Sequence, residues 1–115
     1  MPLSADTREC SPLTEIKNTN QGGGTDWLFL GMPGTCSAFG GSTGGCVMSF
    51  NITSSFPTTA AATRASAAGT SGIVVDNVST DGHASSLYYS TLGAASCTGG
   101  TTGGCAIQTT QSGLQ

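Results

Sequence analysis

Apolar and polar residues alternate most regularly just after Cys46, over residues 47–53. This period of two is typical of a half-buried β-strand. The short apolar run 27–30, which ends before Gly31 and Pro33, predicts its antiparallel neighbour. The two faces of the strand at 47–53 are Met48, Phe50 and Ile52 on one side and Ser49, Asn51 and Thr53 on the other.

Three further apolar segments, 72–75, 86–90 and 105–109, predict strands, and turn residues separate the first two. The pattern predicts a mainly β fold, an antiparallel β-meander with few helical residues. The apolar face of this sheet must be shielded from solvent, and we expect a longer helix, removed or on another chain, to pack against it. The residues expected on that face are Trp27, Phe29, Met48, Phe50, Ile52, Val74, Tyr88 and Ile107.

Two segments have helical signals. Ser11 and Pro12 suit the N-cap and the first position of a short helix over 11–17. The Ala-rich segment 58–68 leaves helix and non-helix open. We expect residues 1–24 to form an N-terminal segment with a Gly-rich linker, and residues 25–115 to form the β domain.

The sequence contains an internal repeat, because residues 36–48 resemble residues 97–107. Each copy has a cysteine, a Gly-Gly-(Ser/Thr)-Thr-Gly-Gly tip, a second cysteine and an apolar pair. Glycine adopts positive φ without steric cost, so each tip can reverse the chain. We expect two disulfide-closed hairpins, Cys36–Cys46 and Cys97–Cys105, although crossed pairings stay open. We call residues 36–46 and 97–105 the first and second cysteine units.

Composition narrows the class of protein. Ser, Thr, Gly and Ala form more than half of the 115 residues, 8% are charged, and the net charge is −3. Three scattered basic residues (Arg8, Lys17 and Arg64) argue against nucleic acid, acidic substrates and anionic membranes. There is no apolar run of about 18 residues that would span a membrane. Five cysteines favour an exported, extracellular or cell-surface protein. No signal peptide is visible, so we expect that a targeting segment was removed or replaced.

Catalytic and metal-binding motifs are weak, and we expect no enzyme, cofactor or metal site. Asp81, His83 and Ser85 or Ser86 lie too close in sequence for a triad, and no Gly-x-Ser-x-Gly elbow occurs. The cysteine spacings are too long for zinc knuckles. Asp76, Asn77 and Asp81 could ligate calcium, but a turn explains them equally well. A glycosidase pair would have to come from Asp6, Glu9, Glu15, Asp26, Asp76 and Asp81.

The sequence leaves two questions of covalent modification open, N-glycosylation and the state of Cys10. Asn51-Ile52-Thr53 and Asn77-Val78-Ser79 match the N-glycosylation pattern, although chance matches are expected in such a composition. Cys10 has no partner in the two units, so it is either a free thiol or the site of an intermolecular disulfide.

The C-terminal segments 87–93 (Leu-Tyr-Tyr-Ser-Thr-Leu-Gly) and 106–114 (Ala-Ile-Gln-Thr-Thr-Gln-Ser-Gly-Leu) stand in the order of two strands of a known family. Over about the last 45 residues the chain resembles the soluble domain of FimT-like minor pilins and H-type pseudopilins. The N-terminal hydrophobic helix and the Gly-Arg-x-Arg tail of some members are missing here, and the duplicated cysteine units are not general in the family.

This resemblance implies a pilin-like subunit of an extracellular filament or secretion apparatus. Its partners would be copies of itself or other pilin-like subunits. The low charge independently suits a subunit packed against others, in a structural or adhesive role. The alternative is a secreted carbohydrate- or surface-binding module that stacks Trp27, Tyr88 and Tyr89 on sugar rings.

Overall fold

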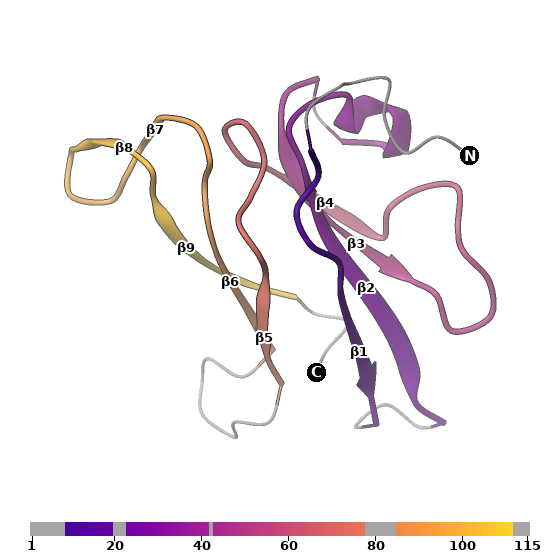
Figure 1. The fold of residues 1–115 in the computed structure, drawn as a ribbon. Coiled ribbons are helices and arrows are strands. Elements are labelled where there is room, and N and C mark those ends of the chain that lie inside the picture. Colours follow the sequence, from indigo (N-terminus) through magenta and orange to yellow (C-terminus); the bar gives the residue numbers. More distant parts are fainter. Residues whose placement is uncertain (1–8, 20–22, 42, 78–84, 112–115) are drawn as a thin grey trace.

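The fold is mainly β, as predicted, and its strands are antiparallel (Figure 1). The computed structural model describes residues 9–19, 23–41, 43–77 and 85–111. The first sheet contains, in spatial order, β1 (Thr14–Asn18), β2 (Thr25–Met32), β3 (Cys46–Asn51) and β4 (Ala62–Ala65). The second contains β5 (Val74–Asp76), β6 (Ser86–Ser90) and β9 (Ala106–Thr110).

The first sheet is a meander, because its strands are neighbours in both sequence and space. The predicted pairing of the apolar run at 27–30 with the alternating segment at 47–53 is confirmed. Strands β2 and β3 pair antiparallel, with Leu28 opposite Phe50 and Leu30 opposite Met48. These cross-strand contacts between apolar side chains stabilise the register.

The helix for which residues 11–17 have signals does not form, because residues 14–17 belong to β1, which pairs with β2. Ile16 packs against the core while Glu15 and Lys17 are exposed, so the strand period suits this segment as well. Residues 58–68 contain β4 and no helix. In both segments, pairing with a neighbouring strand outweighs local helical propensity. Because β1 lies within residues 1–24, the N-terminal segment contributes a strand to the first sheet.

The second sheet departs from simple meander order. A small hairpin, β7 (Ala95–Ser96) and β8 (Thr102–Gly103), lies between β6 and β9 in the chain, yet β6 pairs directly with β9. The strands predicted at 72–75, 86–90 and 105–109 are confirmed as β5, β6 and β9, with ends shifted by one or two residues at β5 and β9.

The two central strands of the first sheet, β2 and β3, are buried on both faces, which corrects the single apolar face expected from the sequence. One face carries Trp27, Phe29 and Val47 and packs on Ile73, Leu87 and Tyr89 of the second sheet. The opposite face carries Leu30, Met48 and Phe50. Because Phe29 lies opposite Ser49 and Leu30 opposite Met48, Phe29 and Met48 cannot share a face.

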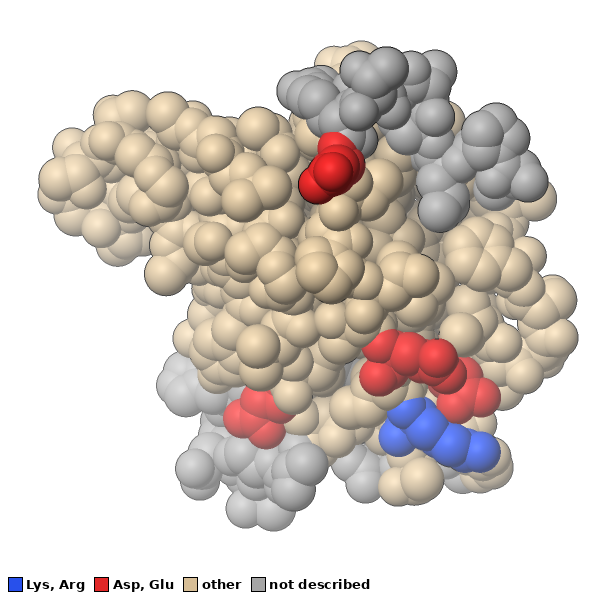
Figure 2. Space-filling view, in the orientation of Figure 1, with Lys and Arg blue, Asp and Glu red and all other residues tan. Residues whose placement is uncertain are grey.

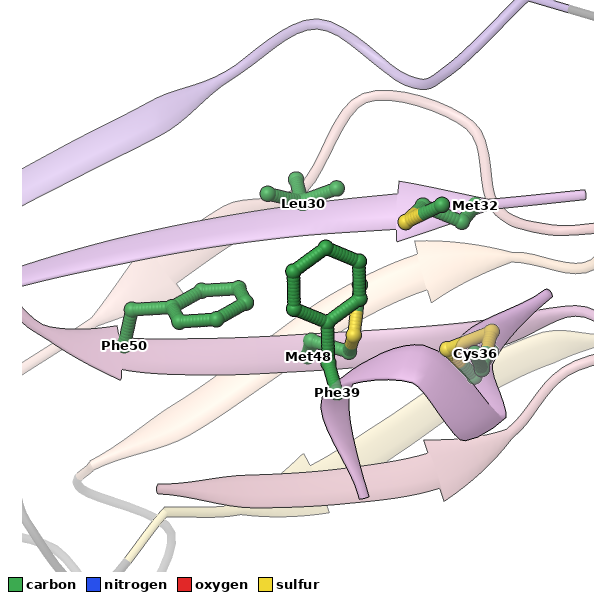
Figure 3. Close-up of a cluster of buried hydrophobic side chains, with 7 residues drawn as sticks. Leu30, Met32, Cys36, Phe39, Met48 and Phe50 are labelled. Atoms are coloured by element: carbon green, nitrogen blue, oxygen red, sulfur yellow. A yellow bond between two sulfur atoms is a disulfide. The ribbon is translucent and has the colours of Figure 1, made fainter. Parts of the chain in front are cut away.

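The core on that opposite face is covered by chain segments of the domain itself (Figure 3). The 3-10 helix η1 (Cys36–Phe39) inserts Phe39, whose ring meets Phe50 edge to face at 5.9 Å between centroids. Phe56 stacks on Phe50 at 5.2 Å. Met48 and Phe50 are therefore 1% and 0% exposed without any additional helix. The expected need for a missing helix to cover this face is wrong.

Candidate functional site

The two disulfides form within the cysteine units, as predicted. The Cα atoms are 6.2 Å apart in Cys36–Cys46 and 5.4 Å apart in Cys97–Cys105. Within the described residues the crossed pairings left open by the sequence are therefore excluded. Cys10 is a free, exposed thiol in the single chain.

The first cysteine unit belongs to the core. Cys36 and Cys46 are both fully buried, and Cys46 is the first residue of β3, where it pairs with Met32 of β2. The unit is not a simple hairpin, because η1 occupies its first turn and ends at Gly40 with φ 86°. The disulfide ties this helix to the first sheet and so holds Phe39 in place.

The second cysteine unit is a true hairpin and extends away from the sheets (Figure 1). Its tip is a turn in which Gly99 and Gly100 have positive φ angles of 107° and 83°. At its base, Cys105 is buried and its backbone N–H donates to Thr91 Oγ1 at 2.9 Å. This unit fixes one projecting turn and covers no core cluster.

The outward surface of β5, β6 and β9 is the first candidate for an interaction. We call this surface the outer face. It contains an open hollow of about 460 Å³, and Tyr89 and Ile107, which also line the hollow, face inward and are not counted in it. The residues of the outer face are Ser71, Gly72, Val74, Tyr88, Ser90, Ala106 and Gln108. Val74 is 65% exposed and Tyr88 37% exposed, and the two are paired across β5 and β6. Gln108 Nε2 donates to Tyr88 Oη at 3.2 Å, which orients the phenol ring.

This surface bears almost no charge. Residues 82–115 contain no Asp, Glu, Lys or Arg, and Asp76 at the end of β5 is the one charged residue in the three strands of the sheet. Figure 2 shows the lobe of β7, β8 and β9 without charged atoms on the visible face. Burying such a surface against another molecule would require little desolvation of charge.

A second hollow of about 240 Å³ lies where β4 and β9 border the gap between the two sheets. Arg64 on β4 reaches across and donates to Thr109 Oγ1 at 2.9 Å. Gln111 Nε2 donates to the buried Ser49 Oγ at 3.1 Å. Burial raises the pKa of Tyr89 above 10.0, although the nearby charge of Arg64 acts in the opposite direction. These polar contacts join the sheets, so we assign this hollow a structural role.

The structure does not bring the residues considered for catalysis together within its described part. Asp6, Asp81 and His83 lie outside the described residues. Ser86 is fully buried and Ser85 is 4% exposed. Within the described ranges, no three His, Cys, Asp or Glu side chains are grouped as metal ligands.

The three aromatic residues considered for sugar stacking are separated by the fold. Trp27 and Tyr89 are 7% and 6% exposed and belong to the core between the sheets. Tyr88 alone is on the outer face, since side chains alternate along β6. Sequence reasoning missed the exposure of Val74 because the run Ile73-Val74-Val75 is apolar throughout and has no period.

Comparison with protein families, curated proteins and solved structures finds no match for this chain. The two disulfides indicate an oxidising, extracellular type of environment. In the described part of the chain, no helix has the length and apolar character needed to cross a membrane.

Proposed function

We propose that this chain is a non-enzymatic structural subunit of an extracellular filament or secretion apparatus, and that the outer face packs against a neighbouring subunit. The observation that carries the proposal is the exposed, nearly uncharged surface around Val74 and Tyr88. Interfaces are depleted of charge at their centres and enriched in aromatic residues such as Tyr. Contiguous exposed apolar positions mark interaction sites in stable domains.

The assembly implied by the C-terminal resemblance is a type IV pilus or a pseudopilus. In that arrangement a hydrophobic helix, encoded upstream or present on another chain, forms the filament core. The helix would attach to a domain whose cores are already closed, since β2 and β3 of the first sheet are buried on both faces. The β domain would then face outward and present the outer face to its neighbours.

Immunogold electron microscopy of intact producing cells, with an antibody against this domain, tests the proposal. We expect gold along filaments for a major subunit, or at tips or bases for a minor one. Protein found free in the medium, with no gold on any filament, would contradict the proposal.

A matched pair of variants tests the outer face itself. Val74→Asp places a charge in the centre of the proposed contact, whereas Leu13→Asp changes a residue of similar exposure, 60% against 65%, elsewhere on the surface. We expect Val74→Asp to abolish incorporation into filaments and Leu13→Asp to leave it unchanged. Equal effects of both variants would show that the outer face is not the contact.

A second candidate function is carbohydrate binding, which the hollow beside Tyr88 favours. Small residues, Gly72, Ser90 and Ala106, leave space next to the ring, and one sugar could stack there. A glycan-dependent rise in the melting temperature of the monomer, lost in Tyr88→Ser, would support this function. The absence of any such rise across a glycan panel would exclude it.

A further inference from the structure

The turn that follows β3 has a well-defined geometry around Asn51. The backbone N–H of Thr53 donates to Asn51 Oδ1 at 3.1 Å, and the Thr53 hydroxyl donates to the same oxygen at 2.6 Å. Both hydrogen bonds define a turn in which the asparagine side chain takes the place of a backbone carbonyl. The carboxamide oxygen is therefore fully engaged by the residue two positions along the chain.

The backbone of this turn is anchored to the first sheet. The N–H of Ile52 donates to Asp26 O at 2.8 Å, and the N–H of Asp26 donates to Thr53 Oγ1 at 2.9 Å. Ile52 also packs against the core that Phe39 covers. The side chain of Asn51 is thus presented from a fixed position at the end of β3.

The amide nitrogen of Asn51 remains available. Asn51 and Thr53 are both exposed, and within the described part of the chain Nδ2 of Asn51 donates to no protein acceptor. Asn51-Ile52-Thr53 also fits the acceptor pattern Asn-x-Thr, since the middle residue is not proline. Motif, exposure and side-chain geometry are three separate observations on the same residue.

We propose that Asn51 is an N-glycosylation site. In the transfer, Nδ2 of Asn51 bonds to the anomeric carbon of an oligosaccharide carried on a lipid pyrophosphate. The bond between that carbon and the pyrophosphate oxygen breaks, the lipid pyrophosphate keeps the electron pair, and Nδ2 loses one proton to a base of the transferase. No oxidation or reduction takes place. The two disulfides indicate an oxidising, extracellular type of environment, which is where proteins with N-linked glycans are found.

The second match to the acceptor pattern provides an internal comparison. Asn77 is half-buried after β5, and Val78 and Ser79 lie outside the described residues. Among the described residues, this turn geometry is found at Asn51. Asn51 also lies on the first sheet, whereas the proposed subunit contact lies on the second, so glycosylation and assembly can be tested separately.

Mass spectrometry of the protein exported by its producing cells tests the proposal. Trypsin cleaves after Lys17 and Arg64, so the Asn51 and Asn77 matches fall in different peptides, 18–64 and 65–115. We expect peptide 18–64 to carry the mass of a glycan. Peptide:N-glycosidase in heavy-oxygen water should remove it and leave a labelled aspartate at position 51.

Variants assign the modification to this turn. Asn51→Gln and Thr53→Ala should remove the glycan, Thr53→Ser should retain it at reduced occupancy, and Asn77→Gln should leave peptide 18–64 unchanged. Unmodified peptide 18–64 as the sole species in the wild-type protein would overturn the proposal, whether or not Asn77 is modified. This result does not depend on the folding of any variant.

Discussion

The two cysteine units have similar sequences but different places in the fold. The first lies against the first sheet, and both of its cysteines are fully buried. The second forms a hairpin whose Cys97 is half-buried and whose tip is exposed. The first unit has Ser37, Ala38 and Phe39 between its first cysteine and its glycines, whereas the second has Thr98 alone. The large apolar side chain of Phe39 therefore explains why the first unit packs on the core and the second unit projects from it. Burial of Phe39 holds the first unit against Phe50.

Removal of the disulfides should show the largest difference between the units. In the chain-entropy model a loop of about 15 residues contributes about 3 kcal/mol, and both loops here are shorter, with separations of 10 and 8 residues. We expect Cys97→Ala/Cys105→Ala to cost about 2 kcal/mol. Cys36→Ala/Cys46→Ala should cost about 4 kcal/mol, because it also leaves a cavity in the core. Urea unfolding measures both values, and equal losses would contradict a core role for the first unit.

Truncation of Phe39 should have the next largest effect. Phe39→Ala removes a 3% exposed ring that covers Phe50, and we expect a loss of about 3 kcal/mol in the free energy of unfolding. The exposed Leu92, which is 61% accessible, provides the control, and Leu92→Ala should change stability by less than about 0.5 kcal/mol. A loss below about 1 kcal/mol for Phe39→Ala would show that this ring does not hold the loop.

The glycines before the second cysteine of each unit provide a matched pair. A Cβ added at Gly45 would lie 2.5 Å from the backbone atoms Ser66 O and Gly69 N, whereas one added at Gly104 would meet Thr91 O at 3.5 Å. We expect Gly45→Ala to cost about 2 kcal/mol through overpacking and Gly104→Ala to be nearly neutral. Thermal unfolding of the two variants measures the difference. Equal melting temperatures would mean that the backbone around Gly45 relaxes freely.

Reduction rates should distinguish the units without any mutation. Thiol–disulfide exchange requires access to a sulfur atom, and the first disulfide has both of its cysteines fully buried. We expect a mild thiol to reduce Cys97–Cys105 first, while the protein remains folded. Alkylation followed by mass spectrometry identifies the order. Faster reduction of Cys36–Cys46 would show that the first unit opens more readily than its burial indicates.

Five strand positions and the disulfide partners were predictable, because they depend on local sequence, whereas β1 and β4 were not. Alternation and apolar runs located β2, β3 and β6, and the short cysteine spacings favoured pairing within each unit. The outer face could not be predicted from local sequence in the same way. Tyr88 and Val74 were expected on a buried face, yet both lie on the exposed surface of the second sheet.

By itself, the sequence determined the mainly β class, the low charge, the acceptor motif at Asn51 and the local cysteine pairs. These are properties of composition and of neighbours in the chain. Only the tertiary structure decided that residues 14–18 form an edge strand, that Phe29 and Met48 lie on opposite faces, and that Phe39 closes a second core. The physical reason is that pairing register and layer packing involve residues far apart in sequence, and the free energy of these contacts outweighs local propensity.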